Sequence, residues 1–229
     1  MNLKYSITVS DEALRAMTLS TAEAYVHGDG QKRKKQKTPA VETLGFLWGH
    51  CTQTYDEMLN IHIDMMSLSL SAERDADSVG DVKNAVLLKN ALLQRWAPHL
   101  MLVGDFHSHP YNTLSEVNEI TGYEFSDCDV EDFLTNDIYW KDNKNPIMVV
   151  MTICKLSKVH EAYNSETVRN NVVCFDVGEF RFWMNVAVGF LTEDGERSPK
   201  RNWTGNTYST VELRLDSKFY NYSGDRLLS

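Results

Sequence analysis

The chain has 229 residues, of which 42% are hydrophobic and 24% charged, and its formal net charge is −9. This length predicts one globular domain over residues 1–229, since a chain of this size can bury roughly 70% of its unfolded surface without disulfide or metal staples. The acidic balance argues against a nucleic-acid partner, and four scattered cysteines argue against a disulfide framework.

No targeting or membrane segment is predicted. The N-terminus lacks the apolar core of a signal peptide, and no apolar stretch reaches the roughly 18 residues needed to cross a bilayer. A soluble cytoplasmic protein without a membrane partner is therefore expected.

The N-terminal part predicts a helix followed by a basic loop. Ser10 can cap a helix that runs to about Tyr25, because Asp11 and Glu12 are favourable in its first turn. Residues 27–38 are polar and basic, which favours a solvated loop. Guidance of an acidic substrate and a localisation signal are the alternatives for this loop.

Two strands are predicted next, at residues 42–49 and 58–70. The first begins with Glu42, and a carboxylate buried without a partner at the head of an apolar run would be costly. A nearby cation would stabilise that charge, and the carboxylate could then accept a proton from an activated water. In the second strand, His62 is expected at the surface rather than as a ligand.

A helix and a histidine-bearing strand are predicted after these. The helix spans residues 79–96, with Pro98 limiting its end. Its apolar residues at helical intervals are Val79, Val82, Val86, Leu87, Leu93 and Trp96. The strand at 100–106 leads into His107-Ser108-His109-Pro110. In a strand, residues i and i+2 face one way with Cα atoms about 6.6 Å apart, so both imidazoles would aim at one point.

A third ligand is expected near residue 129. Two histidines and one carboxylate with an open fourth position form a common catalytic zinc site, and Asp129 can supply the carboxylate. The alternative carboxylates are Asp105, Asp127 and Asp132. Ser126 and Asp129 also have the spacing of a capping box, which would begin a helix at 126–136 beside the metal.

Residues 111–125 form an insert between the histidines and this helix. Leu114, Val117, Ile120 and Tyr123 fall at helical spacing, which predicts a short amphipathic turn over the site. Such a loop can serve as a lid or contact the substrate. Cys128 lies inside the Ser-x-x-Asp motif, but no histidine motif points to it as a nucleophile.

Strands dominate the remaining residues. A buried strand at 146–154 is expected beside the histidine strand, followed by strands at 171–177 and 180–190. A polar surface loop is predicted at 193–206 and a half-buried strand at 211–216. The tally indicates one α/β unit with insertions.

The three motifs together resemble the JAMM family, also called MPN+, of zinc peptidases and isopeptidases. That family shows Glu, then His-Ser/Thr-His-Pro, then Ser-x-x-Asp, and this chain has Glu42, His107-Ser108-His109-Pro110 and Ser126-Asp127-Cys128-Asp129 in the same order. Glu42-Thr-Leu-Gly-Phe-Leu-Trp-Gly49 is also similar to the family's Glu-x-x-Gly-x-Leu-x-Gly strand. Fifteen residues separate Pro110 from Ser126, which exceeds the family's usual spacing.

The resemblance implies an α/β (α+β) fold with a curved mixed β-sheet flanked by helices, the JAMM/MPN (cytidine deaminase-like) architecture. It implies Zn2+ held by His107, His109 and Asp129, with Glu42 as general base and Ser126 as oxyanion donor. The implied reaction is hydrolysis of a peptide or isopeptide bond after the C-terminal tail of a ubiquitin-like protein, as in bacterial stand-alone members. A non-catalytic MPN-type scaffold is the alternative. A zinc deaminase would need His-x-Glu and Pro-Cys-x-x-Cys motifs, which the sequence lacks.

Overall fold

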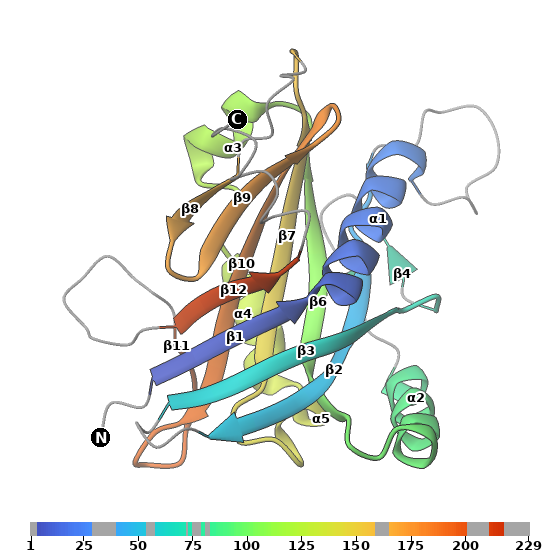
Figure 1. Cartoon of the computed structure of the whole chain (residues 1–229), viewed down its shortest axis with the longest axis vertical. Helices are drawn as coiled ribbons and strands as arrows, with labels where there is room; N and C mark the ends of the chain where they lie inside the picture. The colour runs from blue at the N-terminus through green and yellow to red at the C-terminus, as the bar shows by residue number, and fades with distance from the viewer. Residues whose placement is uncertain are drawn as a thin grey trace.

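The computed structural model describes residues 4–28, 40–53, 58–71, 73–74, 79–80, 83–158, 165–200 and 211–217. The predicted basic loop at 27–38 therefore lies outside the described residues from position 29 onward. Within them the chain forms a mixed α/β fold, in which one strongly curled mixed sheet is flanked by helices, as predicted (Figure 1).

One sheet contains most of the described strands, in the spatial order β12-β1-β3-β2-β6-β7-β10-β9-β8, with β11 paired to β10. Its strands are β1 (Lys4–Ser10), β2 (Leu44–Gln53), β3 (Met58–Leu68), β6 (Met101–Tyr111), β7 (Ile147–Lys155), β8 (Ser165–Arg169), β9 (Val172–Val177), β10 (Phe180–Leu191), β11 (Arg197–Lys200) and β12 (Val211–Asp216). A separate pair consists of β4 (Glu73–Arg74) and β5 (Val79–Gly80). The sheet is mixed, because β1 runs parallel to β3 and β12, and β6 runs parallel to β7.

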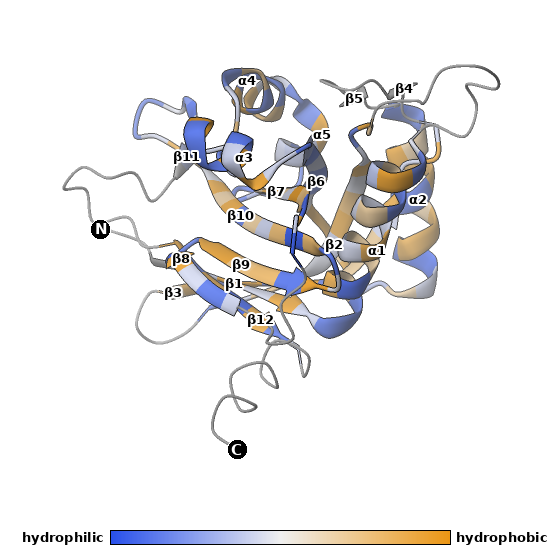
Figure 2. Ribbon diagram, turned by 90° about the horizontal axis from the view of Figure 1, so that it is seen from above, coloured by the Kyte–Doolittle hydropathy of each residue, from blue (hydrophilic) through white to orange (hydrophobic). Residues whose placement is uncertain are grey.

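Helices cover both faces of this sheet. They are α1 (Asp11–His27), α2 (Lys83–Trp96), α3 (Leu114–Ile120), α4 (Asp127–Thr135) and α5 (Asp137–Trp140). Alternate residues of β7 divide between two cores: Val149 lies in the core that α1 joins, and Val150 in the core that α4 and α5 join. Figure 2 shows α3, α4 and α5 grouped on one side of the sheet. None of the described helices is long and apolar enough to span a membrane.

The predicted helix at 79–96 is wrong in its start and in its buried face. Val79 belongs to β5, Val82 lies outside the described residues, and α2 begins at Lys83. Val86 is fully buried, but Leu87 is 47% and Trp96 87% exposed. Positions 87 and 96 lie roughly 100° and 80° to either side of Val86 around the helix axis. The contact between α2 and the sheet is narrow, so it buries Val86 and leaves the side chains at positions 87 and 96 in solvent.

Two further predictions need correction. The polar loop expected at 193–206 contains β11, an edge strand that pairs with β10. Pro199 is tolerated in this strand because a residue of an edge strand does not need to donate a backbone hydrogen bond on its open side. The histidine strand expected at 100–106 is longer, since β6 continues through both histidines to Tyr111. By contrast, Ser10 caps α1 as predicted, and its side chain accepts a hydrogen bond from the Ala13 amide.

Candidate metal centre

Strand β6 presents His107 and His109 on one face of the sheet. On one side β6 pairs with β7, His107 beside Val150 and His109 beside Thr152. On the other side β2 begins at Leu44, opposite His107. The Ser108 amide donates to Thr43 on this second side, so the nitrogen of Pro110 faces the same way, beyond the first residue of β2. The strand therefore accepts a proline without losing a bond to β2.

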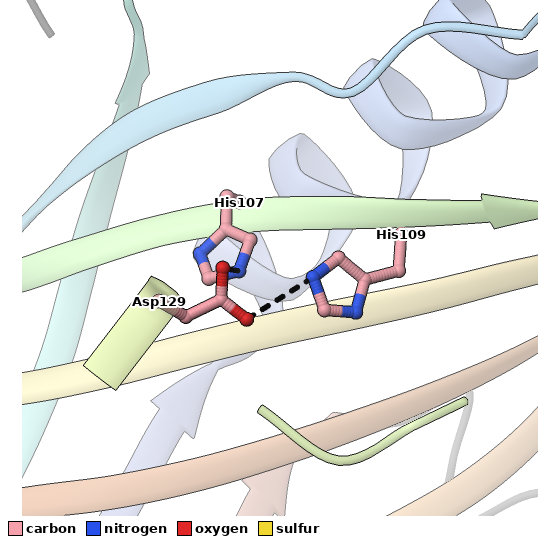
Figure 3. A group of neighbouring side chains, drawn as sticks. All are labelled: His107, His109 and Asp129. Atoms are coloured by element: carbon pink, nitrogen blue, oxygen red, sulfur yellow. Dashed lines mark ion pairs between the residues drawn. The ribbon is translucent and has the colours of Figure 1, made fainter. Parts of the chain in front are cut away.

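Helix α4 delivers Asp129 to the histidines. Ser126 caps the helix: its Oγ accepts from the Asp129 amide at 3.1 Å, and Asp129 Oδ2 accepts from the Ser126 amide at 2.6 Å. This reciprocal pair is the capping box predicted from the sequence. Because one carboxylate oxygen is held by the cap, the carboxylate has a fixed direction, and it points between the two imidazoles (Figure 3).

The three side chains have the spacing of metal ligands. Nε2 of His107 lies 3.3 Å from Asp129 Oδ1, and Nε2 of His109 lies 3.4 Å from Asp129 Oδ2. Ligands bound at about 2.1 Å to one ion lie up to about 4 Å apart, so these atoms can share an ion with little movement. Among the described residues this is the group of three or more histidine, cysteine and acidic side chains whose ligand atoms lie close enough together to hold a metal; Asp105, Asp127 and Asp132 do not belong to it.

An unpartnered nitrogen supports this fit. His107 is 7% exposed, and its Nε2 has no hydrogen-bond partner among the described residues, because the approach to Asp129 is poorly aligned. A buried polar atom left without a partner costs about 1–3 kcal/mol. A metal ion between His107, His109 and Asp129 would remove this cost.

The protonation states suit two of the three ligands already. Burial would raise the pKa of Asp129, but contact with His107 and His109 outweighs burial and holds it well below its usual range. Burial lowers the pKa of His107 despite the nearby Asp129. Burial also opposes the charge on His109, but Asp129 and Glu42 outweigh it and raise the pKa of His109. The raised pKa of His109 lets protons compete with a metal for this ligand up to a higher pH than for an ordinary histidine, which makes binding weaker at low pH.

Glu42 lies beside the histidines. It is 8% exposed and lies two residues before the start of β2. Ser108 fixes its position, because the Ser108 amide donates to the Thr43 carbonyl and Ser108 Oγ accepts from the Thr43 amide, both at 3.0 Å. Continuing the β2–β6 register by two residues puts Glu42 opposite His109, which agrees with its effect on the pKa of His109. Ser108 thus has a structural role.

The insert at 111–125 forms α3, the short amphipathic element that was predicted. Val117 is fully buried, while Ile120 is 62% exposed, so Ile120 does not join the predicted apolar face. After α3 the chain turns back onto the end of β6. A Cβ on Gly122 would lie 2.7 Å from the ring of Tyr111, so any larger residue here would have to displace that ring.

A buried polar network anchors the segment between α3 and Ser126. Thr152 Oγ1 donates to the Gly122 carbonyl at 2.9 Å, and Asn185 Nδ2 donates to the Tyr123 carbonyl at 3.0 Å. Asn185 is 1% exposed, and its Oδ1 accepts from Asn171 Nδ2 at 2.8 Å. These residues lie on β7, β9 and β10 or just before them, so the core of the sheet sets the position of the segment leading to Ser126. Sequence reasoning missed them, although an asparagine inside the apolar run of β10 is itself unusual.

Replacing Asn185 by alanine should destabilise the protein and loosen the metal centre. The change removes the side-chain donor to the Tyr123 carbonyl, which should lower the free energy of unfolding by about 1–3 kcal/mol. The Asn171 amide loses one of its two acceptors and keeps its bond to the Val186 carbonyl. Urea unfolding and metal affinity should both be measured. The control is Asn118→Ala on the exposed face of α3, expected within about 0.5 kcal/mol of the parent. If Asn185→Ala were destabilised but bound metal with unchanged affinity, the buried polar network would not position the metal ligands.

No family model matches this sequence, and no curated protein matches it either. Functional conclusions therefore rest on the side chains that the fold brings together. Two imidazoles and one carboxylate could hold a divalent transition metal, a second carboxylate lies beside them, and a hydroxyl lies at the helix start.

Proposed function

We propose that the chain is a zinc metallopeptidase or isopeptidase of the JAMM type, which cuts after the C-terminal tail of a ubiquitin-like protein. The observation that carries this proposal is the convergence of His107 and His109, from β6, with Asp129, from α4, at ligand spacing. The motifs that resemble the JAMM family thus lie in one place. The curled mixed sheet with helices on both faces is consistent with the JAMM/MPN architecture.

Zinc suits this ligand set best. Catalytic zinc sites use three protein ligands from histidine and carboxylate and leave the fourth position open. When bound, the ion supplies Lewis-acid chemistry that makes water acidic enough to act as a nucleophile near neutral pH. His107 and His109 would each bind through Nε2, the atom that faces Asp129.

Glu42 is the proton carrier in this proposal. Its carboxylate accepts the proton of the attacking water and then gives it to the departing amine of the scissile bond. Both transfers need a side chain that is held close to His109 and shielded from bulk water. The two bonds between Ser108 and Thr43 and the burial of Glu42 meet these needs.

Ser126 is the oxyanion donor. Its Oγ accepts from the Asp129 amide, so that bond leaves the hydroxyl hydrogen available for the tetrahedral oxyanion. Losing one such donor typically costs about 2.7–4 kcal/mol of transition-state stabilisation.

Ser126→Gly should therefore lower kcat about 10²- to 10³-fold while the protein still binds metal. Glycine is chosen because it costs a helix N-cap only a few tenths of a kcal/mol relative to serine. Steady-state cleavage and metal content give the result, and Cys128→Ala is the matched control, since Cys128 is exposed in the same helical turn. A kcat within about threefold of the parent would remove Ser126 from the mechanism.

A pocket of about 680 Å³ gives the substrate tail a place to bind. It opens where β6 and β7 end, and it is lined by the start of α3 together with Lys155, Lys158 and Arg181. His109 on β6 and Thr152 on β7 lie a few residues before the ends of these strands, on the way from the pocket to the candidate metal centre. Its volume lies in the range of ligand pockets, and an extended tail could run from it along the strand ends to the metal.

The test is cleavage of a ubiquitin-like tail fusion beside the metal content of the same sample. One zinc per chain, with cleavage that a chelator abolishes and zinc restores, would support the proposal. Zinc without cleavage of several tail fusions would refute the substrate class. A chain that binds no zinc even when zinc is in excess would favour the non-catalytic scaffold instead.

A further inference from the structure

A second histidine cluster lies on β2 and β3, away from the site described above. His50 and His62 are directly opposite each other across the antiparallel pair. Their rings stack with centroids 4.4 Å apart and planes only 2° from parallel. Asp64 Oδ2 lies 2.6 Å from His50 Nδ1, and the side chains of His50 and Asp64 are 41% and 35% exposed, so solvent can reach the cluster.

A β-bulge places the carboxylate beside the histidines. Trp48 pairs with Met65 and Gly49 with Ile63, which leaves Asp64 as the extra residue of β3. A Cβ on residue 49 would lie 1.7 Å from the His62 carbonyl oxygen, so the close strand approach at the bulge requires glycine. Bulges redirect side chains, and this one turns Asp64 toward His50.

The contact between Asp64 and His50 has the form of an outer-shell metal interaction. A metal-binding histidine almost always donates its other ring N–H to a carboxylate or carbonyl, which fixes the tautomer. In the neutral tautomer that donates from His50 Nδ1 to Asp64, His50 Nε2 has its lone pair free for a metal. The second imidazole, His62, is already parallel and adjacent.

We propose that His50 and His62 form a second binding site for a late first-row divalent cation, with Asp64 orienting His50 and water completing the coordination. Two nitrogens bound at 2.0–2.1 Å in tetrahedral geometry lie about 3.3 Å apart. The present 4.4 Å separates the ring centroids, and the lone pairs of stacked, parallel rings do not converge on one point. His62 therefore has to rotate out of the stack to another rotamer to direct a ring nitrogen at an ion bound to His50 Nε2. Imidazole ligands suit copper, nickel and zinc, and copper binds most tightly in that series.

This site is separate from the candidate metal centre. Leu44 pairs with His107, and β2 carries the chain six residues further to His50, a distance of about 20 Å in an extended strand. The proposal does not depend on the proposed peptidase activity, because it concerns different residues and is read out by metal binding alone.

The experiment is titration of the metal-free protein with Cu2+. The number of ions bound and their affinities are measured at equilibrium, and nitrogen hyperfine splitting in electron paramagnetic resonance spectra reports whether imidazole nitrogens bind the copper. The wild type should bind two ions per chain, and His109→Ala should retain the ion at His50 and His62. His62→Gln should weaken that ion at least tenfold, and Asp64→Asn about 10- to 100-fold, as loss of an outer partner does. His99→Gln is the control, because His99 is exposed and lies outside both clusters.

Two results would overturn the proposal. One is a wild type that binds no second ion at millimolar Cu2+. The other is a second ion whose affinity and nitrogen couplings are the same in the His62→Gln and His99→Gln proteins, because copper would then bind elsewhere. Circular dichroism of each variant checks the fold, and a His50→Gln protein repeats the test from the other strand.

Discussion

Replacing His109 by alanine is expected to remove the metal ion and the hydrolytic activity together. His109 Nε2 is one of the ligand atoms brought together at the candidate metal centre, and water would have to take its place. Loss of an outer partner of a metal ligand costs about 10- to 100-fold in metal affinity, and loss of the ligand itself should cost more. Activity should fall to the level of the chelated enzyme.

The measurement is zinc content and cleavage rate on the same preparation, with His99→Ala as the control. His99 is exposed, so its replacement should leave both quantities unchanged. Thermal unfolding with and without zinc adds a second readout, since an ion that binds only the folded state raises its melting temperature. Wild type should show this zinc-dependent shift, and His109→Ala should lose most of it.

The third ligand is tested by Asp129→Ala in the same series. If this variant kept full metal occupancy, a neighbouring aspartate would be the ligand, and Asp132 is the first candidate because its charge already acts on His107. The geometry argues for Asp129: its two oxygens face the two imidazoles at similar distances.

The sequence was sufficient to predict that His107, His109 and Asp129 come together as a candidate ligand group, because the requirements of that group are local. His-x-His can converge only in a strand, and Ser-x-x-Asp begins a helix whose third residue is the aspartate, so each motif carries its own geometry. The capping box at Ser126 and the pairing of β6 with β7 were found as predicted. The fold therefore had to add only one long-range feature, the packing of the start of α4 against the end of β6.

The remainder depends on contacts between distant residues, which periodicity does not encode. Strand β1 was not predicted, and its partner β12 lies some 200 residues away in the chain. Which face of α2 is buried was decided by the sheet around Val86 rather than by the spread of apolar residues along the helix. Asn185 acts on Tyr123 across 62 positions, and His50 meets His62 only because of the bulge at Asp64.

Glu42→Gln should abolish turnover while the protein keeps its metal. Glutamine has the shape of glutamate but cannot carry a proton between water and amine, and general acid–base catalysis contributes about 10²- to 10⁴-fold. Since Glu42 is absent from the ligand group, zinc content and the zinc-dependent gain in melting temperature should match the wild type. This profile is the opposite of His109→Ala, which loses both.

The comparison is kcat, KM and zinc content for wild type, Glu42→Gln and Glu119→Gln. Glu119 lies on the exposed face of α3, so its replacement controls for the loss of one negative charge on this acidic protein. If Glu42→Gln kept near-normal kcat, another group would carry the proton and the mechanism proposed for Glu42 would be wrong. If it lost zinc as well, Glu42 would act on the metal through His109, opposite which the β2–β6 register places it. Only loss of kcat with zinc retained assigns proton transfer to Glu42, because binding of the metal and movement of the proton then depend on different residues.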